Sequence, residues 1–330
     1  MLALLTLSAV ALTATVPAFA LFGKKDPPVS PDAPVAESLT LETYQGIACT
    51  GTLSAGEGSF TFAIADAPKK GEVVIAEDGV TFTYTPAPKK TGADRFTYTA
   101  TDAAGRTSAP AAVSVEILKQ KTAISYTDMA DSTAHNAAIA LAERGLYTGR
   151  QIGGSWFFEP DEALTRSEFL AIAMDAAALT VPQDVQLTGF ADDGVIPTWA
   201  KSYASAAVRE GLITGVSTAE GLSFCGEDAI TLGEAAAVMD RLLDVADVSV
   251  ATVSTGRNWA AQAVANMEAA QVIAAGSFGS GAAANSITRA EAAEMIVSAI
   301  HLMESRQETG GLFGWLKSKT ASEKDGLTAP

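Results

Sequence analysis

Arg166 and Arg289 are the residues of this sequence whose type and position most clearly suggest chemistry. Each directly follows a threonine and stands two residues before a glutamate. Thr-x-x-Glu before an apolar run is typical of a helix capping box, which places each arginine at the first helical position. A cation there opposes the helix dipole, at a cost of about 0.3–1 kcal/mol when exposed. Because the placement recurs, we interpret it as a carboxylate-binding site, in which free helix amides and a planar guanidinium both favour an anion. The alternative is an interhelical salt bridge, with Asp161 or Asp128 as the partner.

The Thr-x-x-Glu string occurs three times, and its threonines are 66 and then 57 residues apart. We expect these residues to start helices and give them little weight as ligand contacts. The three pairs are Thr165 with Glu168, Thr231 with Glu234, and Thr288 with Glu291. In the second copy, Leu232 stands where the other two copies have arginine. A leucine cannot donate a hydrogen bond to a carboxylate, so a groove built on that helix is predicted to bind weakly or not at all.

Trp199 and Trp259 open an earlier helix in the second and third copies, and His135 stands near that place in the first. Both tryptophans are candidates for ligand binding, because an indole ring can stack on the face of a sugar. At helical spacing, however, Trp199 aligns with Tyr203 and Trp259 with Met267, and such stripes more often belong to a hydrophobic core. Both interpretations stay open at this point.

These residues lie in an alanine-rich stretch with a helical pattern. Each copy has a first helix, a glycine-bearing turn and then the capped helix, and this internal repeat decides the expected architecture. Glycine suits the position after a helix because it adopts the left-handed conformation without strain. The three units span residues 125–181, 188–246 and 250–306.

Residues 36–118 alternate apolar and polar side chains at period two, which is typical of half-buried strands. Turn signals such as Asp78-Gly79 separate the strands. The alternating runs are residues 59–64, 80–84, 95–99 and 113–117. Several short strands with this punctuation predict a β-sandwich of about eighty residues.

Composition argues against several classes of function. The chain has 330 residues, 22 Lys and Arg against 38 Asp and Glu, and a formal net charge of −16, which disfavours nucleic acid as a partner. Its two cysteines, Cys49 and Cys225, are far apart, and only two histidines, His135 and His301, are present. We therefore expect no disulfide framework, no metal site, no cofactor and no catalytic residues.

The N-terminus has the features of an export signal. Residues 1–20 contain a short apolar run that ends in Ala18-Phe19-Ala20, a small-x-small cleavage pattern. We predict a mature N-terminus at Leu21, although no basic residue follows Met1 and the true start is open. A proline-rich linker at 21–35 and a tail at 307–330 complete the chain, and we expect no membrane span in the mature form.

The predicted sandwich resembles the cadherin-like, immunoglobulin-like repeat domains of bacterial surface proteins. The motifs that carry the resemblance are Pro68-Lys69-Lys70-Gly71, Phe82-Thr83-Tyr84-Thr85-Pro86, Gly92-Ala93-Asp94-Arg95-Phe96-Thr97-Tyr98 and Asp102-Ala103-Ala104-Gly105. Many relatives bind calcium through acidic clusters. This copy lacks an Asp-rich loop, so we expect no strong calcium site and interpret Asp94 and Asp102 as turn formers.

The three helical units resemble S-layer homology (SLH) domains. The matching motifs are Tyr126-Thr127-Asp128, Phe158-Glu159-Pro160, Phe190-Ala191-Asp192, Trp199-Ala200, Trp259-Ala260 and Thr288-Arg289-Ala290-Glu291. In the second unit Cys225 is taken to replace the usual proline, and Leu232 the arginine. The resemblance implies a multidomain protein, in which an all-β sandwich precedes an all-α, pseudo-threefold SLH bundle with ligand grooves between its units.

The SLH resemblance also implies a function. The family attaches exported proteins without a covalent bond to the bacterial cell wall, usually to a pyruvylated secondary polysaccharide and in some bacteria to peptidoglycan. We therefore expect a secreted, non-catalytic surface protein, with the sandwich as spacer or as a module that contacts other surface proteins. A self-assembling S-layer or adhesive protein is the first alternative, and a wall-anchored enzyme is the second.

Overall fold

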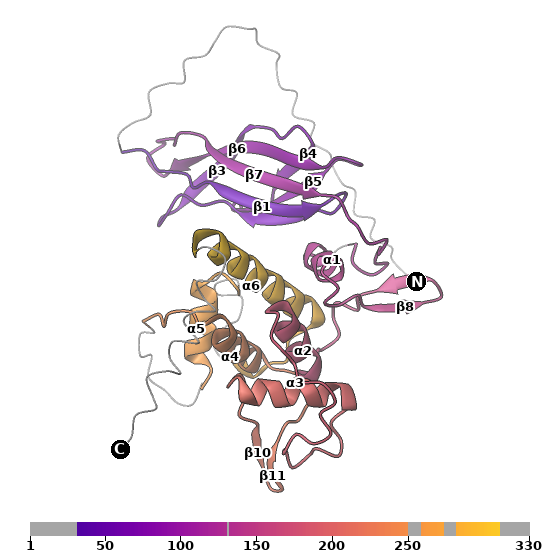
Figure 1. The fold of residues 1–330 in the computed structure, drawn as a ribbon. Coiled ribbons are helices and arrows are strands. Elements are labelled where there is room, and N and C mark those ends of the chain that lie inside the picture. The colour runs from indigo at the N-terminus through magenta and orange to yellow at the C-terminus, as the bar shows by residue number, and fades with distance from the viewer. Residues whose placement is uncertain (1–31, 131, 250–258, 274–281, 311–330) are drawn as a thin grey trace, which may run out of the picture.

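The computed structural model describes residues 32–130, 132–249, 259–273 and 282–310, and Figure 1 shows a β-sandwich stacked on a helical part. The predicted signal peptide, most of the proline-rich linker and most of the tail lie outside the described residues. The predicted sandwich is confirmed: seven strands, β1 to β7, form two sheets between Leu39 and Leu118.

The two sheets of the sandwich differ in size. The larger sheet has the order β1 (Leu39–Tyr44), β7 (Ala111–Leu118), β6 (Gly92–Asp102), β3 (Phe60–Asp66). The smaller sheet has the order β2 (Cys49–Thr52), β5 (Thr81–Pro86), β4 (Gly71–Ile75). Strand β1 pairs with β7 in parallel, and the other pairs are antiparallel.

Alternation along β5 and β6 builds the core between the sheets. Phe82 and Tyr84 on β5 and Phe96 and Tyr98 on β6 are all at most 1% exposed. Phe82 meets Phe96 edge to face, with ring centroids 5.2 Å apart. Successive side chains of a strand point to opposite faces, so the period of two in the sequence directly supplies this aromatic layer.

Asp94 lies inside strand β6 and is buried, whereas the sequence suggested a residue within a turn. Its carboxylate accepts hydrogen bonds from the amides of Lys69 and Lys70 at 3.0 and 2.8 Å, and from the Tyr84 hydroxyl at 2.8 Å. Asp94, on β6 of the larger sheet, thus holds the turn that connects β3 to β4 of the smaller sheet. Asp102 fits the prediction better, since it accepts the amides of Ala104 and Arg106 at 2.9 Å in the turn that follows β6.

The stability of the sandwich is expected to depend on ionised Asp94. Burial alone would raise the pKa of Asp94, but the amides of Lys69 and Lys70 and the Tyr84 hydroxyl outweigh it and lower the pKa below its usual value. A lowered folded-state pKa stabilises the fold above the unfolded value of about 4, and this contribution is lost as the pH falls through the folded value. Asp94→Asn should therefore cost about 1.5–3 kcal/mol at pH 7 and progressively less below pH ~4. Urea unfolding of both proteins between pH 7 and pH 2.5 checks this, and a pH-independent difference would contradict it.

The helical part contains six α-helices among its described residues. They are α1 (His135–Glu143), α2 (Arg166–Ala176), α3 (Thr198–Arg209), α4 (Leu232–Leu243), α5 (Ala261–Ala269) and α6 (Arg289–Gly310), with a 3-10 helix η1 at Ala282–Ala284. Each first helix packs against the capped helix of the preceding unit: α3 on α2, α5 on α4, and α1 on α6. The last pair joins the third unit to the first.

The prediction of an all-α part is wrong for the first two units, because each inserts a β-hairpin between its helices. The hairpins are β8 (Arg150–Ile152) with β9 (Ser155–Phe157), and β10 (Val216–Thr218) with β11 (Gly221–Ser223). In the first hairpin, Gly153 and Gly154 both have positive φ values, 57° and 88°. Two consecutive glycines in this region favour the tight turn that joins antiparallel strands.

A closed ring of backbone hydrogen bonds links the three units just before their capped helices. The Leu164 amide donates to the Ile287 carbonyl at 3.3 Å, Ile287 donates to Ile230 at 3.1 Å, and Ile230 donates to Leu164 at 2.9 Å. All three side chains are at most 1% exposed and belong to one hydrophobic core. The repeat found in the sequence is therefore also a repeat in space, with these residues at its centre.

Among the described residues, no helix has the length and apolar character needed to cross a membrane.

Candidate functional site

The three predicted capping boxes are present. The amides of Glu168, Glu234 and Glu291 donate to the hydroxyls of the threonines three residues earlier, at 3.2, 3.3 and 3.2 Å. In return, the glutamate carboxylates accept the amides of Thr165, Thr231 and Thr288 at 2.9, 3.0 and 2.7 Å. The interpretation of these six residues as helix starters is confirmed.

The first amides of the capped helices are not free for a ligand, which corrects one part of the sequence interpretation. Each first amide donates to a carbonyl of another unit: Arg166 to Asp228 at 2.9 Å, Leu232 to Asn285 at 2.9 Å, and Arg289 to Glu162 at 2.7 Å. The second amides of α2 and α6, at Ser167 and Ala290, are likewise bound to Gly226 and Pro160. Any anion at these places must therefore be held by side chains.

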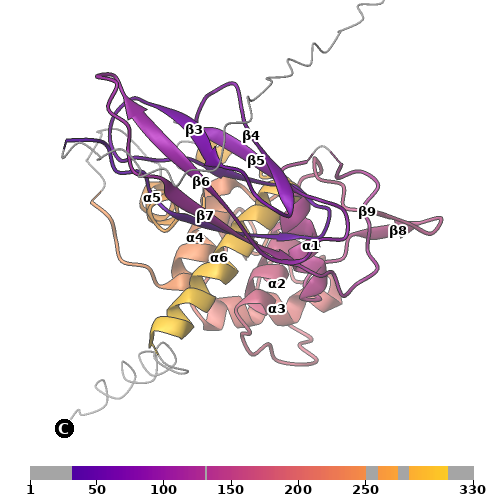
Figure 2. The same cartoon turned by 90° about the horizontal axis from the view of Figure 1, so that it is seen from above.

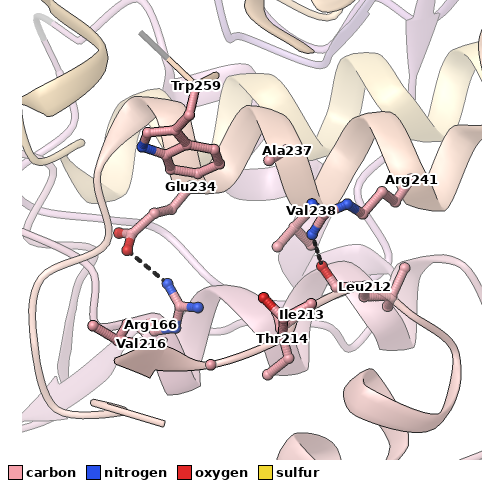
Figure 3. Close-up of a pocket in the computed structure, with 11 residues that line it drawn as sticks. Arg166, Leu212, Ile213, Thr214, Val216, Glu234, Ala237, Val238, Arg241 and Trp259 are labelled. Atoms are coloured by element: carbon pink, nitrogen blue, oxygen red, sulfur yellow. Dashed lines mark hydrogen bonds and ion pairs between the residues drawn. The ribbon is translucent and has the colours of Figure 1, made fainter. Parts of the chain in front are cut away.

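Arg166 is buried at 8% exposure, although it starts a helix. Its guanidinium lies 2.8 Å from the free oxygen of Glu234, whose other oxygen serves the capping box of α4 (Figure 3). Glu234 therefore joins α4 to α2 as well as starting α4. The salt bridge proposed as the alternative exists, but its partner is Glu234, neither Asp161 nor Asp128. The Arg166 Nε has no partner among the described residues.

The side chain of Arg166 lines a pocket of about 360 Å³ that lies between the units (Figure 3). A second guanidinium, that of Arg241, lines the pocket and donates to the Leu212 carbonyl at 2.7 Å. Trp259 stands at the rim, 67% exposed. Two guanidinium groups against the single carboxylate of Glu234 leave this pocket with an excess of positive charge, and its volume is in the usual range for small-molecule sites.

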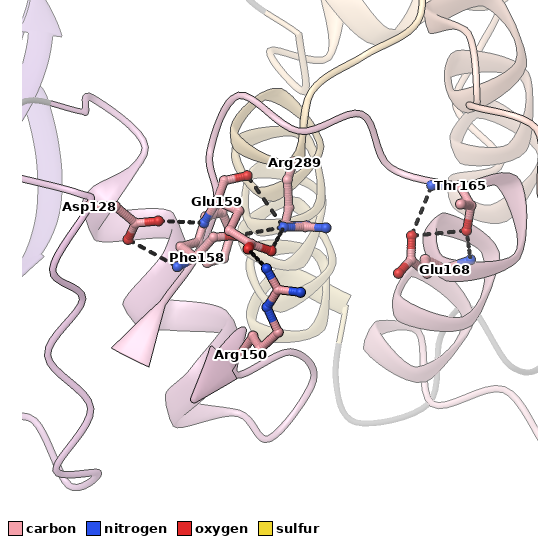
Figure 4. A network of polar contacts seen from close by, with 7 residues as sticks. All are labelled: Asp128, Arg150, Phe158, Glu159, Thr165, Glu168 and Arg289. Carbon is pink, nitrogen blue, oxygen red and sulfur yellow. Dashed lines mark hydrogen bonds and ion pairs between the residues drawn. The ribbon is translucent and has the colours of Figure 1, made fainter. Parts of the chain in front are cut away.

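Arg289 is engaged more fully than Arg166. Its Nη1 lies 2.9 Å from the Phe158 carbonyl and 3.0 Å from the Glu159 carboxylate (Figure 4), and its guanidinium stands 5.6 Å from the centre of the Tyr147 ring. Arg150 pairs with the same carboxylate of Glu159. Here too the salt bridge exists with a partner that the sequence did not suggest.

The tryptophans lie on the surface, so of the two interpretations left open by the sequence the one that places them in the core is wrong. Trp199 is 51% exposed and Trp259 is 67% exposed. Trp199 still contacts Tyr203, as the helical spacing suggested, with ring centroids 6.4 Å apart. Small alanines fill the core side of these helices, including Ala200 and Ala204 at 0% exposure, which leaves no space for an indole.

Asp128 and Asp192 were missed as determinants of the site, although each ends an aromatic-x-Asp motif. The Asp128 carboxylate accepts the amides of Phe158 and Glu159 at 3.0 and 2.7 Å (Figure 4). Asp192 accepts the amides of Phe224 and Cys225 at 2.7 and 2.8 Å. The repeat of the aromatic-x-Asp motif could have indicated this role, because carboxylates at equivalent positions of two units are expected to accept hydrogen bonds from equivalent amides.

The same contacts correct the assignment of Cys225. Cys225 and Glu159 both have left-handed backbones, with φ values of 55° and 57°. Cys225 therefore corresponds to Glu159, and Gly226 stands where the first unit has Pro160. Leu232 is buried at 1% exposure and belongs to the core, so the second unit has an apolar anchor where the others have a guanidinium.

Comparison with known proteins agrees with the fold of the first part. Residues 31–119 match the family described as bacterial cadherin-like domain. The chain carries a bacterial cadherin-like domain. The match covers the strands of the sandwich, from β1 to β7.

A curated relative gives a second finding. The chain is 34% identical over 128 residues to the surface-layer 125 kDa protein of Lysinibacillus sphaericus. The match covers 38% of this chain and only 10% of the relative's own length. The cadherin-like domain and this relative together suggest a cell-surface protein.

Solved structures resemble the chain only weakly. One is the fibronectin(III)-like modules of Clostridium thermocellum CbhA, 16% identical, with 26% of this chain and 98% of that chain covered and a TM-score of 0.19. Another is the sialic acid binding region of a Streptococcus sanguinis SK1 adhesin, 19% identical, with 47% of this chain and 41% of that chain covered and a TM-score of 0.22. At these TM-scores the likeness carries no argument about function.

Proposed function

We propose that this chain is an exported, non-catalytic surface protein that holds an anionic cell-wall polymer through its helical repeats, without a covalent bond. The pocket beside Arg166 is the observation that carries the proposal. It brings together two guanidinium groups, one carboxylate and an exposed indole in about 360 Å³. A guanidinium pairs with a carboxylate and an indole packs on the apolar face of a sugar ring, so the pocket fits an acidic saccharide.

A carboxylate-bearing saccharide, such as a pyruvylated secondary wall polysaccharide, is the ligand class that this chemistry favours. The SLH resemblance of the three units supports the same choice, and peptidoglycan is the second candidate. The cadherin-like domain then acts as spacer or as a contact for other surface proteins. A net charge of −16 means that the rest of the surface repels the polymer, so binding depends on the local positive pocket.

Co-sedimentation of the full chain with wall sacculi tests the proposal. Binding to untreated sacculi is expected, with loss of binding after chemical removal of the secondary polymer. Binding that persists after removal would make peptidoglycan the ligand. Absence of binding to untreated sacculi from several bacterial wall types would contradict the proposal.

The similarity to a surface-layer protein favours one further candidate, a self-assembling layer protein. Dialysis from chaotrope without any added wall material separates the two. Ordered arrays seen by electron microscopy would support self-assembly, whereas a monodisperse solution would leave wall binding as the proposal.

A further inference from the structure

Apolar side chains of the sandwich enter the core of the helical part. Tyr44, at the end of β1, and Ile47, just after it, are 4% and 8% exposed and pack in the hydrophobic cluster of the helices. The core between the two sheets of the sandwich is a separate cluster. Removing the helical part would therefore expose both side chains, which a freely tethered domain would not bury there.

Asn136 on α1 binds the backbone of β1 in both directions. Its Nδ2 donates to the Glu42 carbonyl at 2.8 Å, and its Oδ1 accepts the Tyr44 amide at 3.2 Å and the Thr43 hydroxyl at 3.3 Å. One amide side chain thus satisfies a donor and an acceptor that an edge strand would otherwise present to water.

Glu143, at the other end of α1, holds the joint between the two parts. Its carboxylate accepts the amide of Lys121 at 2.9 Å and the amide of Thr122 at 2.6 Å. A short polar connection such as Lys119-Gln120-Lys121 would by itself let the two parts move independently. Its backbone is instead bound to the helix that also carries Asn136.

The sandwich stands over a particular place in the repeat, as both Figure 1 and Figure 2 show for α1 and α6. A cavity of about 760 Å³, the interface cavity, lies between β1 and β2 above and helices α1, α5 and α6 below. Its residues Thr133, Glu294 and Ser298 occupy the positions that Trp259, Ala237 and Arg241 occupy in the pocket beside Arg166. The interface cavity is therefore the counterpart of that pocket, one unit further along.

The interface cavity and the pocket beside Arg166 differ in the sign of the charged side chains that line them. The described residues that line the interface cavity include no lysine or arginine, whereas Glu42 and Glu294 line it. The helix-start position that provides Arg166 in the other pocket is here Leu232, which is buried. A leucine at this position cannot donate a hydrogen bond to an anionic ligand.

We propose that the sandwich is docked as a fixed part of the helical part, over the one repeat position that lacks an arginine, so that anionic polymer can be held only at the Arg166 and Arg289 positions. The first half of this proposal concerns the fold alone. The second half rests on the proposed function, since it sets how many of the three equivalent places serve the polymer.

Amide hydrogen exchange at Tyr44 tests the docking in the full chain without any ligand. The Tyr44 amide has the Asn136 side chain as its acceptor, so it should exchange slowly only while the sandwich is docked. In wild type we expect protection similar to that of neighbouring β1 amides. In Asn136→Ala we expect exchange at Tyr44 to be faster by about tenfold or more, with the amides of Leu164, Ile230 and Ile287 unchanged.

Ser202→Ala is the matched control, because Ser202 follows Trp199 by three residues as Asn136 follows Thr133, but lies on α3 away from the sandwich. It should leave the Tyr44 amide as in wild type. Unprotected Tyr44 in wild type would overturn the docking, and so would equal exchange in Asn136→Ala and wild type. The wild-type measurement decides the matter even if the variant does not fold.

Sedimentation with sacculi tests the second half. Asn136→Ala is expected to bind sacculi as wild type does, because the described residues lining the interface cavity beside Asn136 include no arginine. Binding increased by about threefold or more would show a polymer site under the sandwich and overturn the restriction to two positions. If wild type does not bind sacculi at all, the proposed function fails, while the docking is judged by Tyr44 alone.

Discussion

Arg166→Ala is expected to weaken binding to wall sacculi by about ten- to a hundredfold while the protein stays folded. The reason is that a hydrogen bond to a charged group contributes roughly 1.5–3 kcal/mol, and the guanidinium of Arg166, paired with Glu234, lines the pocket. Co-sedimentation with sacculi over a range of protein concentrations measures the effect, and near-ultraviolet circular dichroism checks the fold.

Two further variants separate ligand binding from the salt bridge. Glu234→Gln removes the partner of Arg166 but keeps the guanidinium, so binding should stay at wild-type strength or increase. Arg106→Ala removes an exposed arginine of the sandwich, with 44% of its side chain accessible, and should leave binding unchanged. If Arg166→Ala and Glu234→Gln both bind sacculi as strongly as wild type does, Arg166 is a structural residue and the proposal of a carboxylate-binding pocket is wrong.

Arg289→Ala is expected to act mainly on stability. Its Nη1 already holds the Phe158 carbonyl and the Glu159 carboxylate, so removing the guanidinium breaks contacts within the helical part. Co-sedimentation with sacculi should show a larger loss of binding for Arg166→Ala than for Arg289→Ala, because Arg166 lines a pocket that also contains Arg241.

Ile230→Ala is expected to lower the free energy of unfolding by about 2–5 kcal/mol, the usual range for removing a large aliphatic side chain from a core. Ile230 is 0% exposed and lies at the centre of the ring that joins the three units. The cavity would open where all three units meet, so all of them should unfold together in urea, followed by the helical circular dichroism signal.

Val208→Ala provides the comparison for Ile230. Val208 lies on α3 and is 44% exposed, so its truncation should change the free energy of unfolding by no more than about 0.5 kcal/mol. Equal effects of Ile230→Ala and Val208→Ala would contradict the central role of the ring. So would a urea transition in which one unit of Ile230→Ala unfolds before the others.

Local sequence patterns determined most of the fold. Period-two alternation was enough to predict the strands that carry Phe82 and Phe96. Successive residues of a strand face opposite sides of the sheet, whatever the distant parts of the chain do. The capping boxes at Thr165, Thr231 and Thr288 were equally readable, because donor and acceptor are three residues apart. The hairpin at Gly153 and Gly154 could also have been predicted from its paired glycines, but the helical repeat on either side obscured it.

Partners distant in the sequence were decided by the tertiary structure. The pattern showed that Arg166 and Arg289 recur, but many carboxylates were equally plausible partners, and only the ring placed Glu234 beside Arg166 and Glu159 beside Arg289. The helix-start amides likewise looked free along the chain, yet carbonyls of another unit occupy them.

The tertiary structure also decided that Trp199 and Trp259 are exposed. It likewise decided where the sandwich docks on the helical part. Helical spacing says which residues share a face of a helix, but not whether another helix covers that face. Here alanines such as Ala204 supply the close contact, and the indoles are left in solvent. No pattern in the sequence indicates that the side-chain amide of Asn136 binds a strand more than ninety residues earlier. The sequence by itself determined which elements form and which residues recur, because those depend on near neighbours, whereas the tertiary structure alone decided which recurring residues meet.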